Sequence, residues 1–373
     1  MLLKSLANIF GFTGTSPKFK RRLHKRCQMQ CPAETLEARR LLTVYIDVDT
    51  TWSGDVTLND DVVVRNNATL TINDNSRIFK SSTSWDLFIS DGSYINSENV
   101  DFYINTYFYG SIDSGDPSQS FTNNIFHGYI SVHGHYLSEL AGNDFASGSS
   151  LNTYGTIDRD TTWVNFNNNG ISTIYMNSDI IVDNNSTLTI EDGITLINRS
   201  TSWELFIRNG SFLNADNVSF NSQVYFSGPV QSADPSQSFA NNIFRNYVSV
   251  HGHYLSELAG NDFASGSSLN TYGTIDRDTT WVNFNNNGIS TIYMNSDIIV
   301  DNNSTLTIED GITLINRSTS WELFIRNGSF LNADNVSFNS QVYFSGPVQS
   351  ADPSQSFANN IFRNYVSVHG HYL

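Results

Sequence analysis

The sequence predicts an all-β protein, a single-stranded parallel β-helix (solenoid) behind a basic leader that is disordered or partly helical. Three observations predict this fold. The polar residues are mainly Asn, Ser, Thr and Asp, which are poor in helix interiors and common in turns. A block of 118 residues is repeated without change. A shorter period of 19–25 residues, marked by apolar side chains, lies inside that block.

Composition limits the class of partner. The chain has 373 residues, with 20 Lys and Arg against 36 Asp and Glu, a net charge of −16. The first 43 residues carry nine basic and two acidic groups, so residues 44–373 carry a net charge of −23. A body this acidic argues against nucleic acid as its partner. No stretch approaches about 18 apolar residues, so no transmembrane segment is expected.

The leader ends in a pattern with targeting character. After a run rich in Lys and Arg, residues 36–42 read Leu-Glu-Ala-Arg-Arg-Leu-Leu. This segment resembles the LEPR-XLL segment near the N-terminus of large bacterial surface proteins, with Ala38 in place of the family's proline. The resemblance implies export to the cell surface or the extracellular space. It assigns the targeting pattern to Leu36, Glu37, Arg39, Leu41 and Leu42. A short basic amphipathic arm is the alternative interpretation.

Both cysteines, Cys27 and Cys31, also lie in the leader. Two thiols make an incomplete zinc site, so we interpret them as incidental. The body has no cysteine, and packing and hydrogen bonds are expected to hold it together without disulfides.

The repeat divides the body into three copies. Residues 131–255 recur unchanged as residues 249–373. We therefore expect a leader over 1–43, a diverged first copy over 44–137, and two identical copies over 138–255 and 256–373. The second copy has seven residues that the first lacks, near Asn167–Gly170. Tandem copies of this kind are typical of stacked arrays.

Apolar alternation inside the second copy predicts about three short strands per coil. Residues 178–190 alternate so that Ile180, Val182, Leu188 and Ile190 point inward, and Asn184 begins a turn. The pattern returns 24 or 25 residues later at Leu205, Ile207, Leu213, Ala215, Val218 and Phe220. A row of phenylalanines marks the further coils: Phe220, Phe244, Phe263 and Phe284. Five coils per copy, at about 4.8 Å each, would advance the chain by about 24 Å.

Asn residues at the predicted corners also favour a β-helix. Asn tolerates left-handed backbone angles, and stacked Asn side chains form hydrogen bonds with one another along the solenoid axis. The pattern of Trp163, Ile180–Val182 and Thr187–Gly193 resembles right-handed β-helix proteins of the pectate-lyase-like superfamily. The resemblance is one of pattern over residues 44–373, and it implies a parallel β-helix. A string of antiparallel β-sandwich domains, one per copy, is the alternative fold.

His-Gly-His is the pattern that most suggests a metal site. Its histidines recur once per copy, at His133, His135, His251, His253, His369 and His371. In a strand, residues i and i+2 point to the same side, so each pair could bind Zn²⁺ or Cu²⁺. Two histidines leave a site half built, and structural or surface histidines are the alternative.

No catalytic residue is assigned. Lyase chemistry needs a base and a cation, yet the body has no lysine after Lys80, and its acidic surface would repel polyuronates. Two carboxylate pairs, Asp158/Asp160 and Glu191/Asp192, are candidates for glycoside hydrolysis. A strand edge and a turn are the alternative roles for them.

The sequence predicts no cofactor, and bound Ca²⁺ is the alternative that its composition leaves open. Each copy has eleven acidic groups beside Asn and carbonyl oxygens at corners, which suit a hard cation. A solvated acidic face is the alternative. Aromatic side chains could stack on carbohydrate unless they fill the core, and the candidates are Trp163, Trp203, Trp281 and Trp321.

Two classes of function follow. The first is an exported structural or adhesive protein of the cell surface or extracellular space, without catalytic activity, whose partners are surface or matrix components such as polysaccharide. The second is a β-helix that binds or degrades polysaccharide as a lyase or hydrolase. Exact duplication favours the first, because identical copies add reach and valency without building one tuned cleft. The chain stops where the next copy would begin, so we also expect a fragment or end-to-end self-association.

Overall fold

The body is a parallel β-solenoid. The computed structural model describes residues 43–208, 210–232, 238–346, 348 and 356–369. Among these residues every strand pairing is parallel, and each strand pairs with a strand of a neighbouring coil, on both sides except at the ends of the ladders. The predicted β-helix is confirmed, and the alternative of antiparallel β-sandwiches is wrong, since sandwiches pair neighbouring strands in opposite directions.

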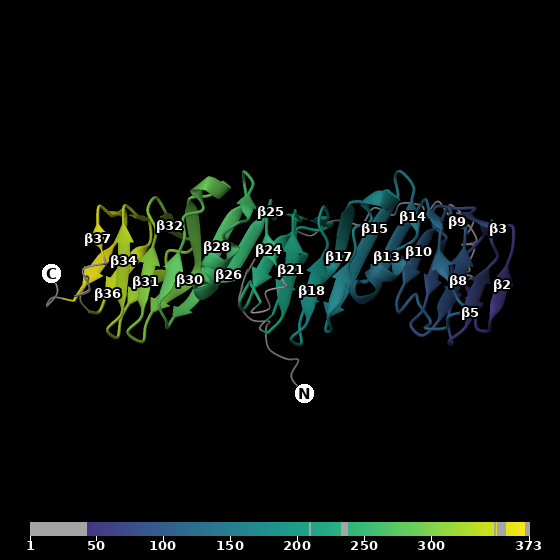
Figure 1. Ribbon diagram of the computed structural model, residues 1–373, viewed down its shortest axis with the longest axis horizontal. Coiled ribbons are helices and arrows are strands. Elements are labelled where there is room, and N and C mark those ends of the chain that lie inside the picture. Colours follow the sequence, from purple (N-terminus) through teal and green to yellow (C-terminus); the bar gives the residue numbers. More distant parts are fainter. Residues whose placement is uncertain (1–42, 209, 233–237, 347, 349–355, 370–373) are drawn as a thin grey trace, which may run out of the picture. The chain divides into compact units, whose positions relative to one another are not determined.

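Three ladders of strands form the first copy and the start of the second, and successive coils lie side by side along one axis (Figure 1). The first ladder contains β1 (Val44–Ile46), β4 (Val62–Val64), β7 (Asp86–Ile89), β10 (Asn105–Phe108) and β13 (Tyr129–His133). The second contains β2 (Thr50–Trp52), β5 (Thr69–Ile72), β8 (Tyr94–Glu98) and β11 (Phe121–Thr122). The third contains β3 (Asp55–Leu58), β6 (Arg77–Lys80), β9 (Asp101–Phe102), β12 (Ile125–Phe126) and β14 (Asp144–Phe145).

The later strands follow the same order. The second copy continues with β15 (Ser150–Ile157), β16 (Thr161–Trp163), β17 (Thr173–Val182), β18 (Thr187–Ile190), β19 (Thr195–Asn198), β20 (Glu204–Ile207), β21 (Phe212–Asp216), β22 (Ser219–Phe220), β23 (Gln223–Phe226), β24 (Phe239–Ala240), β25 (Ile243–Phe244) and β26 (Tyr247–His251). The third contains β27 (Asp262–Phe263), β28 (Ser268–Ile275), β29 (Thr279–Trp281), β30 (Thr291–Val300), β31 (Thr305–Ile308), β32 (Thr313–Asn316), β33 (Glu322–Ile325), β34 (Phe330–Asp334), β35 (Ser337–Phe338), β36 (Gln341–Phe344), β37 (Phe357–Ala358), β38 (Ile361–Phe362) and β39 (Val366–Val368). Within the described ranges, four 3₁₀ helices interrupt the strands: η1 (Gly134–Leu140), η2 (Asn167–Asn169), η3 (Gly252–Leu258) and η4 (Asn285–Asn287).

The predicted inward residues form the core. Ile180 and Val182 on β17 are fully buried, and the corresponding residues of the next coils stack on them. Phenylalanines from successive coils stack inside the third ladder, with ring centroids 5.1 Å apart between Phe102 and Phe126. Such a stack extends along the axis, so each coil adds apolar contact to its neighbours.

Asparagine shapes the corners as predicted. All fourteen described residues other than glycine with positive φ are asparagines, for example Asn184 at 60° and Asn185 at 58°. Buried asparagines also bond along the axis: Asn124 Nδ2 donates to Asn143 Oδ1 at 2.8 Å. These bonds satisfy polar groups that would otherwise be buried without partners.

Two long strands of the second copy each cross a corner and connect two ladders. In β15, Leu151–Thr153 pair with Ile174–Met176 of β17, whereas Gly155–Ile157 pair with Ile180–Val182. The first half of β17 then pairs with β19, and its second half pairs with β20. β28 and β30 repeat this arrangement in the third copy.

The ladders therefore change position from copy to copy. The first ladder of the first copy continues through β15 and β17 into β19, β22 and β25. A shift of 118 residues relates β19, β22 and β25 to β6, β9 and β12, which belong to the third ladder. The equivalents of β7, β10 and β13 are β20, β23 and β26, which form a separate run of pairings. One side of the solenoid thus carries the first ladder of one copy and the third ladder of the next.

The corner of β15 depends on a glycine. Gly155 adopts φ +98°, and a Cβ there would lie 2.2 Å from Nε2 of His133. Any other residue would be strained by that backbone angle and would also collide with the imidazole.

The seven residues that distinguish the second copy cover an exposed end. They include η2 and Gly170, which has φ +100°. Asn169 Nδ2 donates to Asp144 Oδ1 at 3.1 Å. The turn therefore lies on β14, where the third ladder of the first copy stops.

The predicted targeting residues of the leader lie outside the described residues, as do Cys27 and Cys31. No helix within the described ranges is long and apolar enough to cross a membrane.

Candidate functional site

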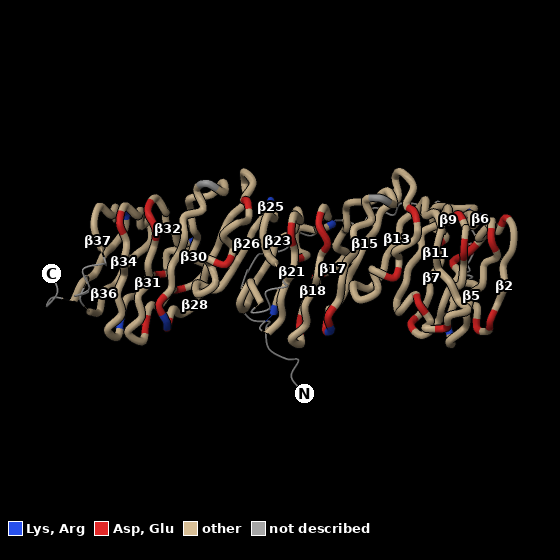
Figure 2. The backbone as a smooth tube through the Cα atoms, viewed as in Figure 1, with Lys and Arg blue, Asp and Glu red and all other residues tan. Residues whose placement is uncertain are grey.

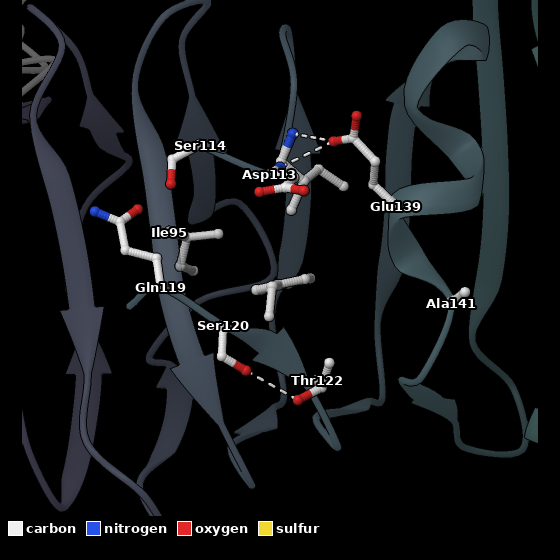
Figure 3. A pocket seen from close by; sticks show the side chains of 10 residues that line it. Ile95, Asp113, Ser114, Gln119, Ser120, Thr122, Glu139 and Ala141 are labelled. Carbon is white, nitrogen blue, oxygen red and sulfur yellow. Dashed lines mark hydrogen bonds between the residues drawn. The ribbon is translucent and has the colours of Figure 1, made fainter. Parts of the chain in front are cut away.

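A cavity of about 270 Å³ opens on the first copy, beside the connection from β10 to β11 (Figure 3). Strand β8 contributes Ile95, and β11 contributes Phe121 and Thr122. The end of η1 contributes Glu139. The remaining wall is formed by Ile112, Asp113, Ser114, Gln119, Ser120 and Ala141.

The carboxylate of Glu139 holds this connection in place. Its Oε2 accepts backbone N–H bonds from Ile112 at 2.6 Å and from Asp113 at 2.9 Å. Hydrogen bonds from two amides to one carboxylate are strong, so the wall of the cavity is preorganised. One repeat later, the carboxylate of Glu257 accepts the same two bonds, at 2.7 and 2.9 Å, from Val230 and Gln231 of the second copy.

Hydrogen-bond acceptors and hydroxyls line the cavity. The Oε1 atom of Gln119 is shielded from solvent and has no hydrogen-bond partner among the described residues. Ser120 and Thr122 share a hydroxyl bond of 3.0 Å, and the side chain of Asp113 is exposed. Together with the apolar Ile95, these groups suit a polyhydroxylated ligand, whose hydroxyls donate bonds while its carbon skeleton contacts an apolar wall.

The second copy alters the cavity. A shift of 118 residues replaces Asp113 by Gln231 and Thr122 by Ala240. The equivalent of Gln119 lies outside the described residues. The complete set of lining groups can therefore be described for the first copy.

Sequence reasoning missed this site, because its residues come from β8, the β10–β11 connection and η1. One signal pointed to it. The connection runs from Tyr109 to Ser120 without a strand, and long connections in a compact fold are often functional.

The histidine pairs differ from the expectation. His133 is the last residue of β13, and Gly134 begins η1, so His135 does not lie in the same strand. The two rings are still close, with centroids 5.0 Å apart, and Nδ1 of His133 accepts the backbone N–H of His135 at 3.3 Å. Nε2 of His135 lies 2.8 Å from Asp158, and its Nδ1 lies 3.1 Å from the hydroxyl of Thr161. The pair is therefore part of the packing at the junction between copies.

Burial lowers the pKa of His133 and of His135, which keeps both imidazoles neutral at neutral pH. His251 and His253 repeat the arrangement in the next junction, with Asp276 at 2.8 Å from His253. His369 follows β39, and His371 lies outside the described residues.

Within the described part of the chain, no three His, Cys, Asp or Glu side chains gather in a way that could hold a metal ion. The histidine pairs thus have no third ligand of these types there. Acidic residues are spread along the described part of the solenoid (Figure 2), and in the full sequence they outnumber Lys and Arg by 36 to 20.

The tryptophan candidates separate into two groups. Trp163 and Trp281 are fully buried, so neither offers a ring face to a sugar, and the carbohydrate-binding hypothesis is wrong at these two positions. Their indole N–H groups donate at 2.8 Å to the carbonyls of Gly134 and Gly252. Trp203 and Trp321 are only partly buried and pack against the edge of the core.

Three of the four candidate carboxylates hydrogen-bond to a neighbouring coil, and Glu309 and Asp310, the third-copy equivalents of Glu191 and Asp192, line one pocket. Asp160 Oδ1 accepts the backbone N–H of Thr187 at 2.8 Å, while Asp158 bonds to His135. Glu191 Oε2 accepts the backbone N–H of Asn165 at 2.8 Å. These carboxylates are engaged between neighbouring coils.

The cavity of the first copy is therefore the best-formed candidate for a binding site, and its chemistry is that of polar recognition. No family model, no curated protein and no solved structure matches this chain.

Proposed function

We propose that the protein is an exported structural and adhesive β-solenoid of the cell surface or extracellular space, without catalytic activity of its own. The observation that carries this proposal is the unbroken run of strand pairings through both junctions between copies. An added copy extends such a run by five coils. From β20 the pairings pass through β23, β26, β28 and β30 to β33, which is the equivalent of β20 in the next copy. Copy number would thus set length.

The leader supports export. Its pattern over residues 36–42 resembles the LEPR-XLL segment of large bacterial surface proteins, and the body resembles right-handed β-helices of the pectate-lyase-like superfamily. A body without cysteine that relies on packing and axial hydrogen bonds fits an extracellular role without disulfides.

Adhesion is proposed to use the cavity of the first copy, with a neutral polysaccharide as ligand. The exposed carboxylate of Asp113 and the hydroxyls of Ser120 and Thr122 match sugar hydroxyls. The acidic body would repel polyuronates, which favours an uncharged chain.

Glycan binding by the full chain tests the proposal. We expect neutral oligosaccharides to bind in calorimetry and the Asp113→Ala variant to bind about tenfold more weakly, because one hydrogen bond contributes about 1.4 kcal/mol. The control is Gln231→Ala, which changes the equivalent loop of the second copy and should leave binding unchanged.

Two outcomes would contradict the proposal. Absence of binding to any glycan would remove the adhesive role of this cavity. Release of reducing or unsaturated sugars that is lost on changing a single carboxylate would instead establish a polysaccharide-degrading enzyme.

A further inference from the structure

Lys80 is the only lysine after the leader, and it is partly enclosed. It ends β6, and its Nζ lies 3.3 Å from Oδ1 of Asp86 at the start of β7. The side chains of Lys80 and Asp86 are 18% and 16% exposed. Nζ also donates to the carbonyl of Thr83 at 3.4 Å.

Asn105 completes a three-residue cluster. It pairs with Asp86 across β7 and β10, and its Nδ2 donates at 2.8 Å to the same Oδ1 atom that contacts Lys80. Its side-chain carbonyl oxygen accepts the backbone N–H of Tyr129 at 3.1 Å. Both ends of the Asn105 carboxamide are therefore hydrogen-bonded. The backbone N–H of Tyr129 polarises its carbonyl, and its nitrogen donates to the carboxylate of Asp86.

These positions match the parts of an amide exchange. An amine acts as nucleophile, a polarised carboxamide as electrophile, and a shared carboxyl group can carry the proton from one nitrogen to the other. We propose that Lys80 and Asn105 form an intramolecular isopeptide bond, with Asp86 as the proton carrier.

The reaction balances without an oxidant or cofactor. Asp86 accepts a proton from the Lys80 ammonium, and the free amine attacks Cγ of Asn105. The Cγ–Nδ2 bond breaks after Asp86 returns this proton to Nδ2. Asp86 then takes the second proton from the attacking nitrogen and passes it to the departing ammonia, which leaves as one ammonium ion. The Lys80 nitrogen ends as a neutral secondary amide, and Asp86 ends ionised as it began.

The environment of Asp86 favours this role. Burial raises the pKa of its carboxyl group, although the neighbouring Lys80 opposes the rise. A carboxyl group with a raised pKa holds a proton more readily, which helps it to pass one between two nitrogens.

The later copies lack the chemistry. At the equivalent positions they carry no lysine, but Asn198, Glu204 and Gln223 in the second copy and Asn316, Glu322 and Gln341 in the third. The bond would therefore occur once, in the diverged copy, where it would tie the end of β6 to the start of β10 across the intervening coil.

Peptide mass spectrometry of the full chain tests the proposal directly. After tryptic digestion of the unmodified sequence, we expect one continuous peptide over residues 78–159, closed into a loop by the link from Lys80 to Asn105 and lighter than the linear peptide 78–159 by one ammonia. Cleavage after Lys80 should be absent. The matched segments around Asn198 and Gln223 should give only linear peptides.

Three variants assign the roles. Lys80→Arg and Asn105→Ala should abolish the cross-link, and Asp86→Ala should leave most of the chain unlinked. Linear peptides with an intact Lys80 cleavage site in the unaltered chain would overturn the proposal, whatever the variants do. Loss of one water with a link from Lys80 to Asp86 would also overturn it, since it would name a different acceptor.

Discussion

At the scale of single residues, His133 shows how the junction depends on protonation. Its Nδ1 atom must be unprotonated to accept the backbone N–H of His135, and Gly155 packs against its ring. Asp158 and Arg159 are the charged groups nearby, and burial is the main cause of its lowered pKa. A proton on His133 would remove one hydrogen bond and place a charge in a partly desolvated site.

A loss of stability at mildly acidic pH is therefore expected. In the unfolded chain a histidine has a pKa of about 6.5, so that chain binds protons that the folded His133 and His251 resist. Stability is full above that pH and falls as the pH drops below it. We expect the midpoint of thermal unfolding to be lower at pH 5.5 than at pH 7.5.

The control for this prediction is another histidine. The double variant His133→Gln, His251→Gln should reduce the pH dependence, with His135 and His253 supplying the remainder, whereas His127→Gln should leave it unchanged. An equal pH dependence in both variants would show that other groups are responsible.

At the scale of elements, the indole of Trp163 connects β16 to η1. It is fully buried and donates to the carbonyl of Gly134 at 2.8 Å. The helix η1 takes the place of a strand in its coil, so it makes few backbone hydrogen bonds to the neighbouring coils. The hydrogen bond from the Trp163 indole helps to hold η1 in place instead.

Trp163→Phe should destabilise the chain by about 1–3 kcal/mol, since the buried carbonyl of Gly134 would lose its donor. Urea denaturation of the full chain measures the effect. Trp281→Phe should cost the same at the next junction, and Trp203→Phe, at a partly buried position, should cost less. Equal losses at Trp163 and Trp203 would mean that packing rather than the hydrogen bond is responsible.

Particular elements also show what can be predicted from sequence. Alternation identified β17 to β20, because Ile180 and Val182 must face the core whichever coil they belong to. It did not reveal that β15 and β17 each cross a corner, since the inward or outward direction of a side chain does not specify which ladder its strand joins. The role of Trp163 stayed open for a related reason, because residue type alone does not distinguish a buried ring from an exposed one. The cavity was missed because its lining comes from three separate segments.

At the scale of the whole molecule, identical copies make length adjustable. Residues 249–255 repeat residues 131–137, so removal of residues 138–255 recreates the same junction sequence. The shortened chain should fold, because every pairing that it needs is one that already exists between the first and second copies.

Small-angle scattering of that variant should show a solenoid shorter by five coils, about 24 Å. The circular dichroism per residue should remain that of a β protein. The control is a variant that removes residues 138–245. Its two cut sites lie at different positions within a coil, so the joined segments do not match, and it should fail to fold. A variant lacking residues 138–255 that aggregated would contradict the idea of interchangeable copies.

The exchange of ladders at each junction determines what a partner encounters. A filament or glycan chain that lies along one side of the solenoid meets a different surface on each copy, although two of those copies are identical in sequence. At each junction a ladder of the new copy begins on a different side of the solenoid. If the same exchange continued at every junction of this three-sided fold, a given ladder would face the same direction again after three copies. Duplication of a copy in this fold therefore presents the same surface in a new direction around the axis. A continuous binding surface made by one ladder does not become longer, because that ladder ends within its own copy.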